Sequence, residues 1–423
     1  MQKKVIALAV AGLVSGAAFA QTNVTIYGTA DATVESVQAK DATATGADIL
    51  NYNRVNSNSS ILGFRGSEDL GGGLKAIFQF ETNINLDSDS GSTSSTANST
   101  TTAIDTTTGN APTSTTTADN LAYQTTTTVR TTNSQRNTIF GSRRDTFVGL
   151  QGGFGQFKAG TLTGPARSLG AAVDLVAGAT GIGSAIPMFG KLGGNGGRAF
   201  GHWDTRYQNA IQYVTPKFGG FEVRALYGAG EQRPQGTKAA ASYEIGGFYI
   251  NGPWYAGLTY GQAKPNTADF ANPNTALGYG YEKLTNVRLA GKYTFQGGHQ
   301  IATLFEQNKA TDYAGGTETA KSSTYGIGGK FKVSQPGAII AQLYQVSKLK
   351  GGSTPTIGQD DYKANFIALG YEHSLSKRTT LKAYYSRISN KDNAHYNYGI
   401  GNINNAALGS NPTGLAVGIR HTF

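Results

Sequence analysis

The side chains that most often carry chemistry in proteins are scattered along this chain. Its five histidines are isolated from one another: His202, His299, His373, His395 and His421. There is no cysteine. A zinc site needs histidine, cysteine or carboxylate ligands that meet in space, commonly marked by short spacings such as two histidines four residues apart. The sequence therefore indicates no metal ligand, no cysteine nucleophile and no metal cofactor.

Glycine-rich stretches offer no cofactor site either. "GGFGQF" and "GIGSAIPMFGK" have neither the spacing of a phosphate-binding loop nor the strand-then-helix context that such a loop requires. A membrane-embedded protease or phospholipase is a further hypothesis, but no Ser/His or Asp/His arrangement points to one. We therefore expect no catalytic residue and no enzyme.

Basic residues form the more informative set, because each falls on the hydrophilic side of a segment in which apolar and polar residues alternate. The set is Arg65, Arg143, Lys158, Arg206 and Arg224. Arg143, for example, is opposite in phase to Val148 and Leu150. Charged side chains around a water-filled passage select ions by their electric field, and this needs no covalent chemistry. These five residues are therefore candidates for ion selectivity if the hydrophilic faces of the segments surround a water-filled lumen.

Alternating segments of about ten residues, as expected for membrane strands, recur along the whole chain and predict an all-β protein. We count sixteen of them: 22–35, 59–68, 74–86, 139–151, 154–162, 205–215, 219–231, 237–250, 254–264, 281–295, 299–311, 322–333, 338–350, 361–374, 378–390 and 414–423. Tight Gly, Pro, Asn or Ser turns alternate with longer polar loops between them. An even number of antiparallel strands, with short turns at one end and long loops at the other, is typical of an outer-membrane β-barrel.

Strand faces support a barrel over a soluble sandwich. In 281–295, Val287, Leu289 and Tyr293 alternate with Asn286 and Arg288. A packed sandwich core could not bury so many charged positions without partners. The last strand runs to the final residue, and closure with the first strand would leave it no free edge, as lipid requires.

The N-terminus and composition agree with export. Residues 1–20 combine two lysines, an apolar run and a final Ala-x-Ala, which predicts a signal peptide. The alternative, an anchor helix, needs a longer apolar run. The net charge of +10 becomes +8 after cleavage, 34 basic residues against 26 acidic ones. The basic residues are spread singly, so we expect an anion-favouring lumen and no nucleic-acid partner.

Two connections are exceptional. Residues 87–137 are nearly all Thr, Ser, Asn, Asp and Ala, which predicts a mobile extracellular loop. An alternative function follows from it, in which the barrel is mainly a scaffold for an adhesive or receptor-like loop. Residues 163–204 are Gly-rich but contain large apolar residues such as Phe189 and Trp203. A long, partly apolar loop is usually functional, and a barrel gives it an interior to pack in.

Several blocks resemble the Gram-negative general porins, in particular the trimeric group that includes neisserial and Burkholderia-type proteins. The blocks are "VTIYGTAD" (24–31), "GFRGSEDLGGGLKAIFQFE" (63–81), "FVGLQGGFGQFKAG" (147–160), "NAIQYVTPKFGGF" (209–221), "IALGYEHSLSKRT" (367–379) and "VGIRHTF" (417–423). The resemblance covers the predicted mature chain, 21–423, apart from the Thr-rich insert. It implies a sixteen-stranded barrel in which the third extracellular loop, here 163–204, folds inward and narrows the lumen.

The resemblance also suggests roles for single residues. It places wall arginines of the constriction at Arg143 and Arg206, and a recognition signal for the outer-membrane barrel assembly machinery at Phe423. Phe423 could equally join an interfacial aromatic girdle. Related sequences often carry an arginine where this chain has Ile61, which would remove one wall charge.

The inward loop is poor in acid. Between 163 and 204 only Asp174 and Asp204 are acidic, against Arg167, Lys191 and Arg198. "IPMFGK" (186–191) resembles the Pro-Glu-Phe-Gly element of enteric porins, with Met188 in place of the acid. We therefore count Asp174, Met188 and Lys191 among the constriction residues and expect anions to pass more readily than cations.

The predicted protein is thus an outer-membrane diffusion porin for small hydrophilic solutes and anions, without a cofactor. The resemblance implies a homotrimer in contact with outer-membrane lipid and lipopolysaccharide.

Overall fold

The computed structural model describes residues 23–87, 140–192, 203–230, 240–264, 281–312, 318–350 and 359–423. The predicted signal peptide and nearly all of the Thr-rich stretch lie outside these ranges. Eighteen strands are present in them: β1 (Asn23–Lys40), β2 (Ile49–Ser57), β3 (Ile61–Gly71), β4 (Leu74–Ile84), β5 (Phe140–Arg143), β6 (Thr146–Gly152), β7 (Gly155–Thr163), β8 (Arg206–Val214), β9 (Phe221–Ala229), β10 (Ala241–Asn251), β11 (Trp254–Lys264), β12 (Tyr281–Thr294), β13 (Gln300–Asp312), β14 (Glu318–Lys332), β15 (Gly337–Val346), β16 (Ala364–Ser374), β17 (Thr379–Asn390) and β18 (Asn411–Thr422).

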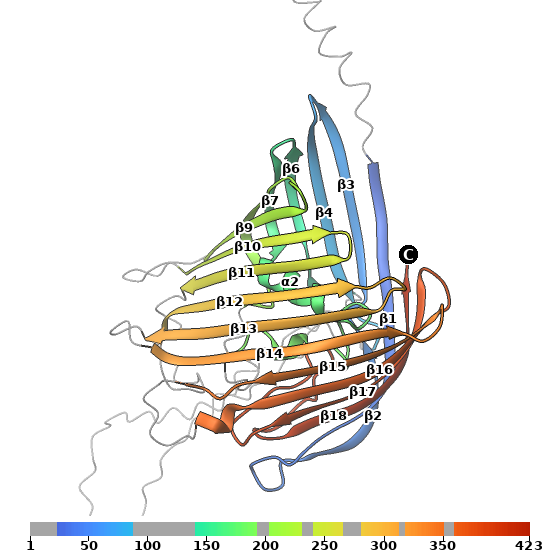
Figure 1. Cartoon of the computed structure of the whole chain (residues 1–423), viewed down its shortest axis with the longest axis vertical. Helices are drawn as coiled ribbons and strands as arrows, with labels where there is room; N and C mark the ends of the chain where they lie inside the picture. The colour runs from blue at the N-terminus through green and yellow to red at the C-terminus, as the bar shows by residue number, and fades with distance from the viewer. Residues whose placement is uncertain are drawn as a thin grey trace, which may run out of the picture.

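These strands make a sixteen-stranded antiparallel barrel, as the alternation predicts (Figure 1). β2 and β3 both pair with β1, so they are two parts of one barrel strand. β5 and β6 both pair with β4 and form another interrupted strand. Eighteen segments less these two breaks leave sixteen barrel strands in the described residues. The breaks lie at 58–60 and 144–145.

The ring closes between the first and last strands. β1 pairs with β18 over twelve residue pairs, from Thr29↔Thr422 to Lys40↔Asn411. The pairing extends to the last residue, because Gly28 and Phe423 exchange two backbone hydrogen bonds of 3.0 Å each. The C-terminal strand therefore has no open edge, which is the condition for a sheet in lipid.

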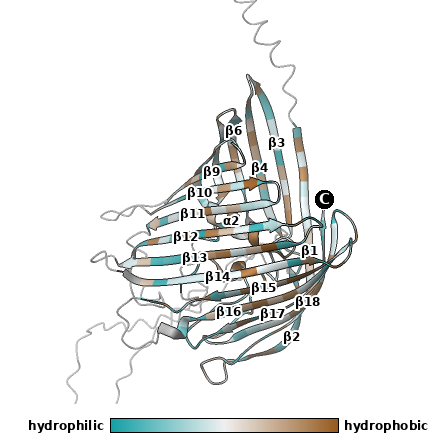
Figure 2. Ribbon diagram, in the orientation of Figure 1, coloured by the Kyte–Doolittle hydropathy of each residue, from teal (hydrophilic) through white to brown (hydrophobic). Residues whose placement is uncertain are grey.

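Side chains alternate between the two faces of the barrel, and Figure 2 shows brown and pale or teal bands alternating along the strands. On β12, Val287 and Leu289 are exposed on the outer face, whereas Asn286 and Arg288 are fully buried inside. The same order holds on β18, where Leu415, Val417 and Ile419 face outward. Apolar residues thus surround the barrel and polar residues line it, as sequence parity predicts.

The short turns lie at one end of the barrel and the long loops at the other. Gly71, Gly72 and Gly73 make the turn from β3 to β4, all with φ between 61° and 87°, which L-residues rarely adopt. Both ends of the described chain, near Asn23 and at Phe423, also lie at this turn end.

Two local details differ from the sequence interpretation. β1 continues to Lys40 and its partner begins at Ile49, so the first strand predicted at 22–35 and the second at 59–68 are both too short. Polar residues such as Asn51 and Asn53 on the exposed side obscure the alternation there. The chain is also not free of helices, because α2 (Pro165–Val173) lies in the long inward loop.

Candidate functional site

The loop between β7 and β8 is here called loop 3, and its described parts, residues 164–192 and 203–205, lie inside the barrel. It begins with α2, whose first turn has a proline at Pro165, where the fixed φ suits a helix start and the missing N–H is not needed. α2 packs against β10, β11, β12 and β13 (Figure 1). Leu169 of the helix is fully buried, near Phe248 and Gly257 of the wall.

Three carboxylates of the barrel wall hold the backbone of loop 3. Glu244 on β10 accepts from the Ala166 N–H at 2.8 Å, Glu306 on β13 from Gly190 at 2.6 Å and Glu372 on β16 from Ala177 at 2.7 Å. Such charge-assisted hydrogen bonds are stronger than neutral ones. The loop is therefore attached near its start and at two points further along the chain.

Two wall cations hold the loop through oxygen atoms. Arg288 on β12 is fully buried, donates to the carbonyl of Ala166 at 2.5 Å and pairs with Asp204 at 2.6 Å. It also pairs with Glu306. Lys292 donates to the Ala172 carbonyl at 2.6 Å. Residues 178–183 of loop 3 also lie against β17, β18 and the break at 58–60, where the Thr180 hydroxyl donates to Ser59 Oγ at 3.4 Å.

Both acidic residues of loop 3 that the structure describes point away from the open lumen. Asp174 accepts from Ser184 Oγ at 2.6 Å, Ala185 N at 3.0 Å and Gln342 Nε2 at 3.0 Å. Burial raises the pKa of Asp174, against these hydrogen bonds, which lower it. Asp204 is held by Arg288.

The loop surface that stays accessible is made mostly of small uncharged residues. Its accessible or half-buried members include Ser168, Ala171, Ala172, Ala177 and Gly178. Arg167 is the one charged residue of α2, and its guanidinium donates to the Asp204 carbonyl. Burial lowers the pKa of Arg167. No carboxylate in the described part of loop 3 therefore presents negative charge to the passage.

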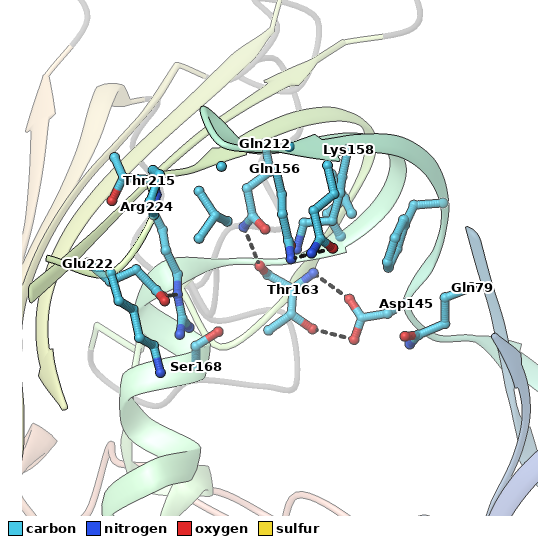
Figure 3. Close-up of a pocket in the computed structure, with 18 residues that line it drawn as sticks. Gln79, Asp145, Gln156, Lys158, Thr163, Ser168, Gln212, Thr215, Glu222 and Arg224 are labelled. Atoms are coloured by element: carbon cyan, nitrogen blue, oxygen red, sulfur yellow. Dashed lines mark hydrogen bonds and ion pairs between the residues drawn. The ribbon is translucent and has the colours of Figure 1, made fainter. Parts of the chain in front are cut away.

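The opposite half of the inner wall, formed by β3, β4 and β6 to β9, is here called the basic wall. A cavity of about 640 Å³ lies between it and α2 (Figure 3). Lys158 and Arg224 reach into this cavity together with Gln79, Gln156 and Gln212. The ammonium of Lys158 lies 5.3 Å from the centre of the Phe147 ring.

Carboxylates neutralise some charges of the basic wall but not all of them. Arg224 pairs with Glu222 at 2.6 Å, Arg206 pairs with Asp145 at 3.3 Å, and Arg144 pairs with Glu81. Asp145 also accepts from the backbone and hydroxyl of Thr163, at 2.6 and 2.7 Å.

Two of the basic residues predicted from the sequence have no carboxylate partner within the described ranges. One is Lys158, and the other is Arg65, whose guanidinium lies 5.1 Å from the Tyr27 ring centre. The five basic and three acidic side chains named here have a balance of +2.

The candidate residues predicted from the sequence lie in different places in the structure. Lys158, Arg206, Arg224 and Arg65 lie on the basic wall. Met188 is fully buried in the core between loop 3 and the barrel wall. Arg143 belongs to β5, which pairs with β4, but its side chain lies outside the described part of the structure.

Lys191 belongs to loop 3, and its side chain faces the loop that follows β17. It is half-buried, and its ammonium lies 5.8 Å from the centre of the Tyr396 ring. Burial lowers the pKa of Lys191 to about 8, and the charge of Asp204 partly opposes the shift. Lys191 thus contributes to the packing of loop 3 near the extracellular mouth.

Sequence reasoning missed several residues. Arg144 reaches Glu81 because the strand is interrupted at 144–145, where simple parity fails. A bulge with Asn209 at φ 47° similarly turns Tyr207 inward, where its hydroxyl donates to Glu244 at 2.5 Å. The sequence indicated only that the wall carboxylates point inward, and nothing in it showed that they bind loop 3. The sequence "GPARSLGAAV", with Pro after Gly, is the signal that could have revealed α2.

Within the described ranges, no group of three or more His, Cys, Asp or Glu side chains could hold a metal ion. Nor does any described helix have the length and apolarity needed to span a membrane.

Comparison with known proteins gives consistent matches along the whole chain. The sequence matches the Gram-negative porin family over residues 7–393. It is 31% identical to outer membrane porin protein 32 of Delftia acidovorans, over 100% of both chains. It is 25% identical to the major outer membrane protein P.IB of Neisseria gonorrhoeae, over 90% of this chain and 91% of that protein. Among solved structures, the anion-selective porin from Comamonas acidovorans superposes with a TM-score of 0.67 at 26% identity, covering 95% of this chain and 100% of that one.

Proposed function

The chain belongs to the family of Gram-negative porins, and we propose that its channel passes small anions more readily than cations. It is an outer-membrane porin, a passive channel and not an enzyme. Its solutes are proposed to be small and hydrophilic, because the passage between loop 3 and the basic wall is lined by charged and amide side chains.

One observation carries the ion preference, namely the asymmetry of charge across the passage. Arg65 and Lys158 on the basic wall have no carboxylate partner among the residues that the structure describes, whereas Asp174 and Asp204 of loop 3 are turned away and bonded. A unit charge about 5 Å from an ion contributes about 0.8 kcal/mol in water, roughly a fourfold change in local ion concentration. The Comamonas acidovorans porin, described as anion-selective, has a similar fold and sequence.

The test is a reversal-potential measurement in a salt gradient across a planar bilayer. We expect a sign that reports anion preference for the native protein and a smaller preference, by about four- to sixteenfold, for Lys158→Glu, which changes the charge by two units. Lys377→Glu, in an exposed turn between β16 and β17, makes the same change of charge outside the passage and should leave the ratio unchanged. A cation-preferring sign for the native channel would refute the proposal.

Three partners complete the proposal. Family membership supports a homotrimer, which the mass of the detergent-solubilised native protein would test. The outward Leu415, Val417 and Ile419 that precede Phe423 support recognition of the last strand by the barrel assembly machinery. The apolar outer surface supports contact with outer-membrane lipid, including lipopolysaccharide. The adhesin hypothesis depended on the Thr-rich stretch outside the described residues, and the relatives named above give it no support.

A further inference from the structure

Glutamine side chains form a continuous part of the cavity between α2 and the basic wall (Figure 3). The glutamines that line it are Gln79 on β4, Gln151 on β6, Gln156 on β7 and Gln212 on β8. These four strands pair with one another in that order. Inward side chains of paired strands lie side by side, so the four amides make one surface, here called the amide surface.

The amide surface keeps hydrogen-bonding groups for a ligand. Gln156 Nε2 donates to Gln151 Oε1 at 3.1 Å, and Gln212 Nε2 donates to the Thr163 carbonyl at 3.1 Å. A glutamine amide has two N–H donors and an oxygen with two lone pairs. The second N–H of each donating amide, and the oxygens of Gln156 and Gln212, are not used in these two bonds. The surface can therefore both donate to a solute and accept from it.

Two cations border the amide surface. Lys158 is directly opposite Gln212 in the pairing of β7 with β8, and it lies on the same face of β7 as Gln156. Arg224 on β9 lines the same cavity, and its Nε donates to Glu222 at 2.6 Å. A guanidinium has five N–H donors, so this bond leaves four of them for a second partner. An anionic group can consequently be held beside the amides.

The charge and size of the cavity limit the class of solute. Lys158, Lys217 and Arg224 line it together with Asp145 and Glu222, three cations against two carboxylates. This excess of one positive charge attracts a solute with a single negative group. Hydroxyl groups match the amides, because each hydroxyl both donates and accepts. The volume of about 640 Å³ lies within the range of about 300–1,000 Å³ typical of small-molecule sites.

We propose that the amide surface, together with Lys158 and Arg224, binds hydroxylated monocarboxylates, the chemical class of the sugar acids. The two cations hold the carboxylate, and the hydroxyl groups lie along the glutamine amides. This inference rests on the proposed function, because it assigns a preferred solute to the same passage. Gln151, Thr215 and Pro216 place the site close to the turns at the periplasmic end of the barrel.

The experiment first compares three six-carbon solutes on the native protein in detergent, namely gluconate, hexanoate and sorbitol. Hexanoate keeps the carboxylate without the hydroxyl groups, and sorbitol keeps the hydroxyl groups without the carboxylate. Isothermal titration calorimetry at fixed ionic strength measures the affinity for each solute. We expect gluconate to bind at least about tenfold more tightly than either of the others, since one net hydrogen bond changes affinity by about fivefold.

A double variant then tests the amides. Gln151→Leu/Gln156→Leu removes both members of a bonded pair, so neither is left without its partner. It should bind gluconate about tenfold more weakly than the native protein does, with little change in the binding of hexanoate. The matched control is Gln296→Leu/Gln335→Leu, which replaces two exposed glutamines in turns outside the passage and should bind gluconate like the native protein. Heat modifiability on a detergent gel shows that each variant is folded.

Equal affinity of the native protein for gluconate and hexanoate, or for gluconate and sorbitol, would overturn the proposal. Native affinity for gluconate in the folded Gln151→Leu/Gln156→Leu variant would overturn it as well. The titration needs no ion flow, so its outcome is separate from that of the reversal-potential measurement. A cation-preferring sign refutes the proposed function, whereas an anion-preferring sign with equal affinities for the three solutes refutes only the sugar-acid site.

Discussion

Individual acidic residues decide how much of the positive charge of the basic wall acts on a permeating ion. Asp145, Glu222 and Glu81 neutralise three arginines, whereas Arg65 and Lys158 have aromatic rings as neighbours instead. Parity along a strand predicts which side chains point inward, because it depends only on the period of two. It cannot predict which inward charge has a partner, because the partner is on another strand.

Asp174 is the clearest case of a residue whose position the sequence could not reveal. A single aspartate in a Gly-rich loop has the same local signature whether it faces the lumen or is buried beneath the loop. Its burial depends on Ser184 and on Gln342, which is more than 160 residues away along the chain.

The placement of Asp174 leads to a prediction with two separate readouts. In Asp174→Asn the reversal potential should stay unchanged, because the charge removed does not face the passage. The folded barrel should nevertheless lose about 1–3 kcal/mol of stability, since an amide replaces an acceptor among buried donors. Heat stability of the folded band on a detergent gel measures the second effect. Asp392→Asn, in an exposed loop, is the control. A marked change of ion preference in Asp174→Asn would show that the acid acts on the lumen.

At the scale of elements, loop 3 is a short helix and an irregular chain held to the wall by side chains from five strands. Polar contacts reach it from β10, β12, β13, β15 and β16. The apolar residues of 163–204 correctly indicated that the loop packs inside the barrel. The helix itself was missed, since it has only nine residues and is too short to show a clear period.

Lys191 makes the packing of this loop dependent on pH. Burial lowers its pKa from 10.5 to about 8. Between these values the unfolded chain binds a proton that the folded chain does not, so stability should rise with pH from about 8 to 10.5, and this gain is lost as pH falls from 10.5 to 8. His395, Tyr396 and Asp204 are the other titratable groups around it.

The measurement is the unfolding temperature between pH 7 and pH 10.5, compared with Lys191→Met. The variant has no ionisable group at this position, so its unfolding temperature should rise less over this range than that of the native protein. Lys391→Met, in the exposed loop after β17, should behave like the native protein. Parallel curves for the native protein and Lys191→Met would contradict the assignment.

For the whole molecule, the number of strands and their direction followed from alternation and turns alone. Sixteen segments with Gly-rich turns at one end predict the barrel because each strand must expose one apolar face to lipid. The two interruptions were not predictable, since β2 and β6 are positioned by pairing with a longer neighbour. Closure depends on contacts between the most distant parts of the chain, β1 and β18.

A substitution at Gly28 tests the pairing of β1 with β18 that closes the barrel. A Cβ on Gly28 would lie 2.4 Å from Phe423 Cζ and 2.7 Å from the Ile61 carbonyl. We expect Gly28→Ala to reduce the yield of folded, heat-modifiable barrel severalfold. Gly291→Ala is the matched control, because a Cβ there would meet neighbours only at 3.5 and 3.8 Å, ordinary contact distances. Equal yields of the two variants would show that the seam tolerates the additional methyl group.

The described parts of loop 3 lie against the wall from β10 to β18, and the described cavity lies on the other side of α2, against the basic wall. The cavity that the structure describes is a gap between two facing surfaces, with α2 on one side and the basic wall on the other. Flat or elongated solutes should permeate edge-on, whereas compact solutes of equal mass should permeate more slowly. The channel should accordingly sieve by the smallest dimension of a molecule more sharply than by its molecular weight.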